Sequence, residues 1–145
     1  MSDDVIAAKQ RAADAPDDAE AQFEAAVAHD RAGMEREAIR YYERVAELGV
    51  PGGIKRRFYV GYGSTLRNVG RADDAVGVLG QALADDPNYP PYSAFLALAL
   101  LSAGHPREAI AAMLGCALDV ALPGAFDGFE RALGAYHAEL LEPKG

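Results

Sequence analysis

The stretch that decides the fold is residues 63–79, with the sequence GSTLRNVGRADDAVGVL. It joins the end of one expected helix to the start of the next through Gly70. A glycine suits the left-handed backbone conformation that ends many helices. Ala75 is small enough to let the two helices approach closely, and Leu79 supplies a large apolar side chain beyond it. The stretch therefore predicts a helix–turn–helix unit.

The same spacing occurs three times in the 145 residues, which indicates an internal repeat. Each copy has a small residue, then a glycine, then an alanine and finally a large apolar residue. In order, the copies are Ala26, Gly33, Ala38 and Tyr42; Gly63, Gly70, Ala75 and Leu79; and Ala97, Gly104, Ala109 and Met113. A two-helix unit cannot bury its apolar face alone, so the three units are expected to stack. The last residue of each copy is expected to fill the space between successive units.

This pattern resembles the tetratricopeptide repeat family over about residues 18–122. The second unit matches the family pattern best, through Gly63, Gly70, Ala75, Leu79, Ala82 and Pro87. The step of 34 residues from Gly70 to Gly104 is the family's period. The resemblance implies an all-α fold: a right-handed α-solenoid of antiparallel helix pairs, with about three repeats plus a C-terminal capping helix. The alanine- and arginine-rich usage indicates a small bacterial protein.

We expect a single domain over residues 1–145. An N-terminal helix is expected within 1–17, the three repeats at 18–51, 54–87 and 90–122, and the capping helix at 125–141. Within the last segment, apolar residues recur at three- and four-residue spacing, namely Phe126, Phe129, Leu133, Tyr136 and Leu140. One apolar stripe of this kind would cover the end of the stack.

Composition and charge argue against several classes of function. The net charge of −8 argues against a nucleic-acid surface, which needs clustered basic residues. The single cysteine, Cys116, excludes an intrachain disulfide and a zinc site with several thiolates, and we expect it to be buried. There is no apolar run of about eighteen residues to span a membrane and no secretory signal, so a cytoplasmic location is expected.

Residues that could carry chemistry do not assemble into a site. The three histidines, His29, His105 and His137, are not spaced like metal ligands, and His29 stands at an apolar repeat position. Gly61 and Gly63 lack the strand and lysine of a phosphate-binding loop. We therefore predict no catalytic residue, no metal site and no cofactor, and do not expect an enzyme.

The first helix of each unit in such a stack is expected to line a concave groove. The predicted groove residues are Phe23, Val27 and Asp30; Arg57, Val60, Ser64, Arg67 and Asn68; and Ala94, Leu98 and Leu101. Arg57 and Arg67 would suit capture of a carboxylate, although they could instead pair with Glu24, Asp30 or neighbouring acidic residues, or face water. Leu98 and Leu101 either form an apolar patch for a partner or lie under the C-terminal helix. The family's carboxylate-clamp pattern of lysines and asparagines is not present.

These observations predict a protein–protein interaction adaptor or scaffold that binds a peptide or partner helix in the groove. The expected partner is another protein or peptide, with an acidic group or a C-terminal carboxylate, and neither nucleic acid nor a membrane. Two alternatives remain. One is a chaperone-like protein for a secreted or assembly substrate, which the resemblance allows. The other is a self-associating structural module, a homodimer formed through the last helix.

Overall fold

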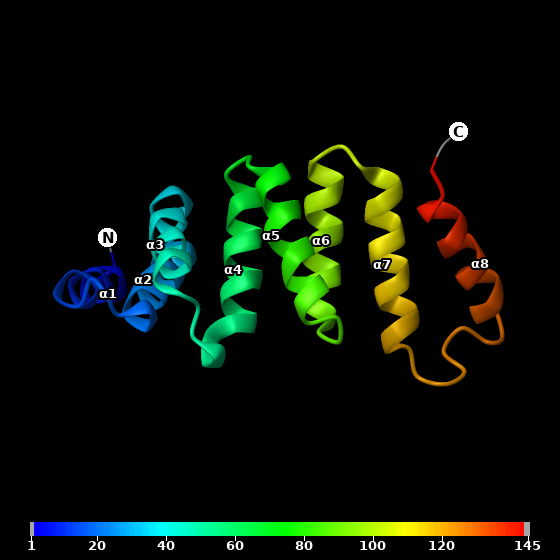
Figure 1. Ribbon diagram of the computed structural model, residues 1–145, viewed down its shortest axis with the longest axis horizontal. Coiled ribbons are helices and arrows are strands. Elements are labelled where there is room, and N and C mark those ends of the chain that lie inside the picture. The colour runs from blue at the N-terminus through cyan, green and yellow to red at the C-terminus, as the bar shows by residue number, and fades with distance from the viewer. Residues whose placement is uncertain (1, 144–145) are drawn as a thin grey trace. The chain divides into compact units, whose positions relative to one another are not determined.

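The computed structural model describes residues 2–143, and all the regular secondary structure in that range is helical. The elements are α1 (Asp3–Asp14), α2 (Ala19–Arg31), α3 (Glu35–Leu48), the 3₁₀ turn η1 (Gly52–Ile54), α4 (Lys55–Asn68), α5 (Ala72–Asp85), α6 (Pro90–Ser102), α7 (Pro106–Val120) and α8 (Glu130–Leu141) (Figure 1). The predicted domain of residues 1–145 also includes residues 1, 144 and 145, which lie outside the described residues.

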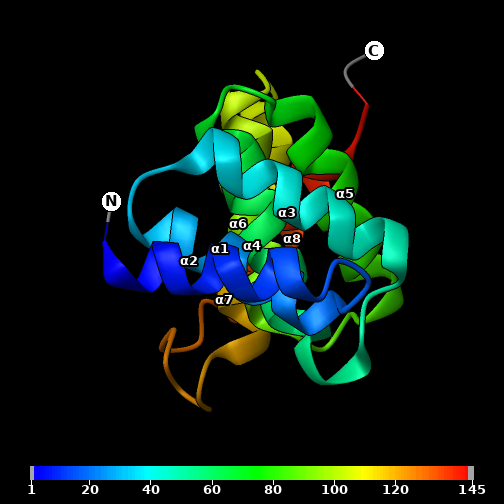
Figure 2. The same ribbon diagram turned by 90° about the vertical axis from the view of Figure 1, so that its left-hand side faces the viewer.

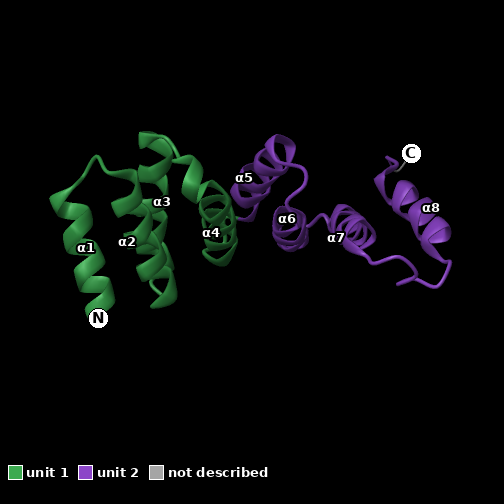
Figure 3. Ribbon diagram, turned by 90° about the horizontal axis from the view of Figure 1, so that it is seen from below, with its two compact units in different colours: residues 1–71 green, residues 72–145 purple. Residues whose placement is uncertain are grey.

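The chain divides into two compact units, residues 1–71 and residues 72–145, which Figure 3 shows in green and purple. Unit 1 contains α1 to α4, and unit 2 contains α5 to α8. The division falls directly after the turn at Gly70, between the two helices of the second predicted repeat.

The three repeat glycines end their helices as the sequence predicts. Gly33, Gly70 and Gly104 have φ values of +75°, +87° and +87°, in the left-handed region that favours glycine. The residue after each glycine donates its backbone N–H to a carbonyl five positions back: Met34 to His29, Arg71 to Leu66 and His105 to Leu100. This hydrogen bond is the one that closes a Schellman turn. Pro106 follows the third turn at the first position of α7, where a missing N–H costs nothing.

The core of unit 1 is aromatic and joins three helices. The ring of Tyr42 lies 6.3 Å from that of Phe23 and 5.9 Å from that of Phe58, measured between centroids. In addition, α2 packs against both α1 and α3 (Figure 2). The α1–α2 contact is made by alanines, with Ala8 and Ala12 of α1 against Ala25 of α2. Large rings and small alanines together let the helices pack closely.

The core of unit 2 is built mainly from small residues. Its buried side chains are Ala75, Leu79, Ala82, Tyr92, Ala97, Ala99, Ala109 and Ala111. Two expectations about this unit are wrong. Met113 was expected to be buried between successive repeats, but it is 42% exposed. Cys116 was expected to be buried, but it is half-buried, with its sulfur 3.7 Å from the Pro90 carbonyl oxygen.

The last helix also differs from its prediction, because α8 begins at Glu130 and not near residue 125. The preceding segment is held in turns by positive φ values at Gly124, Asp127 and Gly128, which a helix cannot accommodate. The predicted apolar stripe does not face α7 as one surface. Phe129 and Tyr136 are 65% and 61% exposed, whereas Phe126, Leu133 and Leu140 are half-buried.

Candidate functional site

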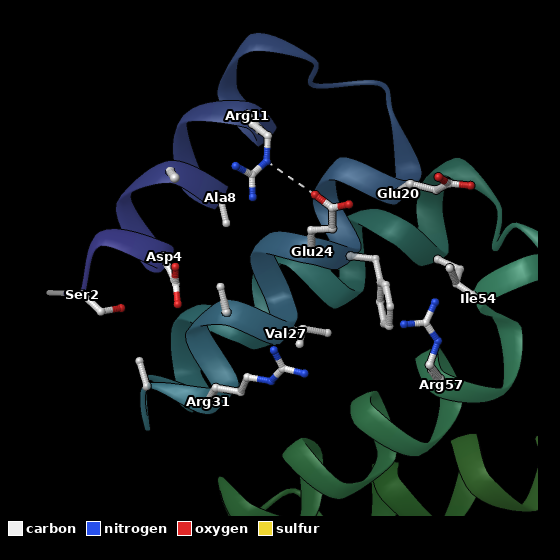
Figure 4. Close-up of a pocket in the computed structure, with 14 residues that line it drawn as sticks. Ser2, Asp4, Ala8, Arg11, Glu20, Glu24, Val27, Arg31, Ile54 and Arg57 are labelled. Carbon is white, nitrogen blue, oxygen red and sulfur yellow. Dashed lines mark ion pairs between the residues drawn. The ribbon is translucent and has the colours of Figure 1, made fainter.

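Unit 1 contains an open groove of about 740 Å³ between α1, α2 and the start of α4 (Figure 4). Its floor is apolar and its rim is charged. Its lining includes Asp4, Ala8 and Arg11 from α1; Glu20, Phe23, Glu24, Val27 and Arg31 from α2; and Ile54 and Arg57 from η1 and α4. A concave surface that combines apolar side chains with charged groups is suited to binding a ligand that carries both kinds of group.

Two arginines approach the same part of the groove from different helices. Figure 4 shows the side chains of Arg31, on α2, and Arg57, on α4, both directed toward the region of Val27. The guanidinium carbon of Arg57 lies 5.4 Å from the centroid of the Phe23 ring, within the range of a cation–π contact. This contact holds the guanidinium at the edge of the apolar floor.

Neither of these arginines has an acidic partner within residues 2–143. Glu24 pairs instead with Arg11, at 3.5 Å between Arg11 Nε and Glu24 Oε2. That pair is exposed, so it contributes at most about 1 kcal/mol to stability. The predicted alternative, in which Arg57 pairs with Glu24 or Asp30, is therefore not what the structure shows. Arg31 and Arg57 remain available to an anionic group of a ligand.

Asp30 lies between helices rather than in the groove. Tyr42, on α3, donates a hydrogen bond of 2.7 Å from its hydroxyl to Asp30 Oδ2. The Thr65 hydroxyl, on α4, lies 2.6 Å from the same carboxylate oxygen and 2.7 Å from the Gly61 carbonyl oxygen. Burial of the phenol, followed by the hydrogen bond and negative charge of Asp30, raises the pKa of Tyr42 above its usual range. Asp30 thus joins α2, α3 and α4 of unit 1.

The remaining predicted residues of α4 lie outside the groove lining. The Ser64 hydroxyl donates to the Gly61 carbonyl at 3.2 Å, and an Arg67 guanidinium N–H donates to Asn68 Oδ1 at 3.5 Å. The Asn68 amide in turn donates to Glu35 Oε1 at 3.4 Å, and Val60 is half-buried. Of the eight predicted residues in unit 1, the groove includes Phe23, Val27 and Arg57.

The three predicted residues of the third repeat lie on α6 in unit 2. Leu98 and Leu101 are exposed and Ala94 is half-buried. The alternative in which the C-terminal helix covers the two leucines is therefore wrong. They form an exposed apolar strip on α6 of unit 2.

The sequence prediction of the groove did not include Arg31 or any residue of α1, the helix that forms one wall of the groove. Arg31 stands four residues after Val27, so it continues the same helical stripe beyond Asp30 and could have been found from spacing alone. The α1 wall was not predicted because α1 precedes the first repeat and carries none of its pattern. Asp4, Ala8 and Arg11 come to the groove through the packing of α1 on α2.

Within residues 2–143, no group of three or more histidine, cysteine, aspartate or glutamate side chains is arranged to hold a metal ion. His29 is a buried core residue, with Nδ1 2.6 Å from the Ala25 carbonyl oxygen and its ring 4.9 Å from that of Tyr41. Among residues 2–143, no helix combines the length and the apolar character that a membrane span requires.

Comparison with known proteins gives the fold and the family. A family profile described as Tetratrico peptide repeat matches residues 19–140. One solved structure, described as a MamA protein, is 15% identical with a TM-score of 0.67, and the match covers 97% of this chain and 68% of that one. A second MamA structure is 18% identical with a TM-score of 0.68, covering 94% and 84%. A search of curated proteins found no match.

At these identities the two MamA structures show the fold alone, and they confirm the predicted all-α class with helix pairs of the tetratricopeptide type. The fold and the profile together support a protein–protein interaction module in general. Because the profile match extends over most of its length, the chain belongs to the tetratricopeptide repeat family.

Proposed function

We propose that the chain is a non-catalytic adaptor whose unit 1 groove binds a short peptide segment of a partner protein. A carboxylate of the peptide, from an acidic side chain or a free C-terminus, pairs with Arg31 and Arg57. An apolar side chain next to it lies over Phe23 and Val27. The observation that carries this proposal is a pair of arginines at the edge of an apolar floor, neither of which has an acidic partner within residues 2–143.

Arginine is the side chain best suited to this role. Its planar guanidinium can donate two parallel hydrogen bonds to one carboxylate, and such charge-assisted bonds are stronger than neutral ones. Arg57 is also held in place by the Phe23 ring, which lowers the entropy lost when a ligand binds.

The acidic residues on the rim restrict which peptides fit. Asp4, Glu20 and Glu24 also line the groove, so a uniformly acidic segment would meet like charges. The groove therefore favours a segment with one carboxylate next to an apolar residue and with polar or basic neighbours. A single groove of this size suits transient binding rather than permanent assembly.

The proposal is tested by selecting ligands from a random peptide library displayed against the purified chain. Selected peptides are then titrated by fluorescence anisotropy against the native chain and the Arg31→Glu/Arg57→Glu variant. Loss of charge-assisted hydrogen bonds worth about 1.5–3 kcal/mol should weaken binding by about 10–100-fold. The selected sequences should share one carboxylate beside an apolar residue.

Arg40→Glu is the matched control, because Arg40 is an exposed arginine of α3 that does not line the groove. It makes the same charge change per site and should alter the affinity by less than about twofold. Circular dichroism checks that all variants keep their helices. Selected peptides without an acidic preference, or equal affinities for the native chain and the double variant, would overturn the proposal.

A further inference from the structure

Helix α7 carries an apolar stripe that no other described helix of unit 2 covers. Ile110, Met113 and Val120 are 57%, 42% and 55% exposed. With the half-buried Ala117 between the last two, they recur at intervals of three, four and three residues, so they lie on one face of the helix. This open α7 face, defined by these four residues, is as long as about three helical turns.

The corresponding face is covered in the other two repeats. Met113 occupies the repeat position of Tyr42 and Leu79, which are 1% and 0% exposed. In unit 1, the next helix α4 covers Tyr42, whose ring lies 5.9 Å from that of Phe58 and 5.7 Å from that of Tyr62. The open α7 face is therefore the surface against which the first helix of a following repeat would pack.

Helix α8 does not take that place, because it packs on a different face of α7. An Arg107 guanidinium N–H donates to the Glu139 carbonyl at 3.1 Å, and Gly115 lies directly against His137. Ala111, on the same stripe between Arg107 and Gly115, is buried. The repeat positions that match Ala111 are Arg40 in α3 and Gly77 in α5, and both are exposed. Thus α8 covers a face that the other repeats leave to solvent.

The charge of unit 2 indicates the chemistry of an occupant. Residues 72–145 contain ten acidic and three basic residues, whereas residues 1–71 contain twelve acidic and eleven basic residues. Almost all of the net charge of −8 is thus carried by unit 2. Two copies that met through this unit would repel each other, whereas a basic partner would be attracted.

We propose that the open α7 face binds a basic amphipathic helix of a partner protein, packed as the first helix of a fourth repeat would be. The apolar side of that helix covers Ile110, Met113 and Val120, and its lysines and arginines are attracted by the net negative charge of unit 2. A helix that lays its apolar side on a complementary surface is a common mode of recognition. This site is separate from the unit 1 groove and does not depend on it.

Three synthetic 18-residue peptides serve as probes. The first has leucines at helical spacing on one face and lysines elsewhere. The second keeps the leucines and replaces every lysine with glutamate, and the third has the composition of the first in scrambled order. Fluorescence anisotropy measures their binding to the full chain. The first peptide should bind, and the other two should bind at least about 10-fold more weakly, because each lacks either the charge or the apolar face.

The variant Ile110→Ser/Met113→Ser removes the apolar contact without changing the charge. It should weaken binding of the first peptide by about 10-fold or more, because the apolar side of the peptide loses two of the side chains that it would cover. Leu98→Ser/Leu101→Ser, on α6, is the matched control and should leave the affinity unchanged. Val120→Ser is a second test at the end of the stripe, should the double variant not fold.

Equal binding of the lysine and glutamate peptides, or an undiminished affinity of both the Ile110→Ser/Met113→Ser and Val120→Ser variants, would contradict the proposal. Analytical ultracentrifugation tests the rival occupant. A native dimer that the Ile110→Ser/Met113→Ser variant converts to a monomer would show that a second copy occupies this face, and the proposal would be wrong. The Arg31→Glu/Arg57→Glu variant should bind the lysine peptide like the native chain, which separates this site from the groove.

Discussion

Tyr42 donates a hydrogen bond of 2.7 Å to Asp30, and this bond joins the two helices of the first repeat. Thr65 brings α4 to the same carboxylate, so one acidic side chain connects three helices of unit 1. Every buried side-chain polar atom in the described residues has a hydrogen-bond partner. A fully satisfied network of this kind favours a single arrangement of the helices, and those helices position the groove.

Tyr42→Phe should destabilise the protein by about 1.5–3 kcal/mol. It removes a hydrogen bond to a charged group and leaves a partly buried carboxylate with one partner fewer. Urea unfolding followed by circular dichroism measures the change. Tyr136→Phe is the control, because Tyr136 is exposed on α8 and should change the free energy of unfolding by less than about 0.5 kcal/mol. Equal effects of the two substitutions would contradict a structural role for the network.

The same network predicts a loss of stability in alkali. The folded protein holds the pKa of Tyr42 above the value of about 10 that a tyrosine has when unfolded. Folding therefore favours the protonated phenol. The contribution of the Tyr42 phenol to the free energy of unfolding is complete below pH 10. Above pH 10 this contribution falls by about 1.4 kcal/mol per pH unit until the pKa of Tyr42 in the folded protein is reached.

Tyr42→Phe has no proton to lose at this position, so its stability should fall less steeply. Denaturant unfolding of both proteins between pH 8 and pH 11 gives the difference between them. That difference should be constant up to about pH 9.5 and should shrink above pH 10. A difference that stays constant across the whole range would show that Tyr42 titrates alike in the folded and unfolded chains.

The local turns could be predicted from the sequence, because a glycine at a helix end has a direct conformational cause. The spacing of Gly33, Gly70 and Gly104 predicts all three turns, and their φ values confirm them. Helical spacing alone could not show that Asp30 lies between helices, since it places Asp30 on the same stripe as Val27. The position of Asp30 between the helices depends on its contacts with Tyr42 and Thr65, and both residues are distant from it in sequence.

The packing of α8 was predicted less well, because it too depends on residues that are distant in sequence. Spacing predicts that Phe129, Leu133 and Tyr136 share one face, but not which face of α7 receives α8. That choice depends on the small surface at Ala111 and Gly115, where His137 fits closely. Met113 remains exposed as a consequence, although its repeat position predicts burial.

Gly61 should be intolerant of a side chain. A Cβ atom at this position would lie 2.6 Å from the Tyr42 hydroxyl, which Asp30 holds in place. Gly61→Ala should therefore lower the free energy of unfolding by about 1–3 kcal/mol, even though alanine is the better helix former. Gly77→Ala, in α5, is the matched control. A Cβ there meets nothing within 4 Å, so the substitution should stabilise the protein by about 1 kcal/mol.

Combining Gly61→Ala with Tyr42→Phe tests the cause of this effect. The phenylalanine ring lacks the hydroxyl that the new methyl group would meet, so alanine at position 61 should cost less in the Tyr42→Phe background. Urea unfolding of the two single variants and the double variant gives the coupling energy. Additive effects would mean that Gly61 acts through something other than contact with Tyr42.

Gly115 should control how firmly α8 is attached to α7. A Cβ atom at Gly115 would lie 2.9 Å from His137 Nε2, and α8 has no fully buried residue with which to resist displacement. Gly115→Ala should therefore speed amide hydrogen exchange across α8, because few buried contacts hold that helix. Exchange in α6 should change little. Gly134→Ala, on α8 itself, has no neighbour within 4 Å and should slow exchange there by favouring the helix. If Gly115→Ala left α8 as protected as before, the His137 contact would not be what holds α8 on this face of α7.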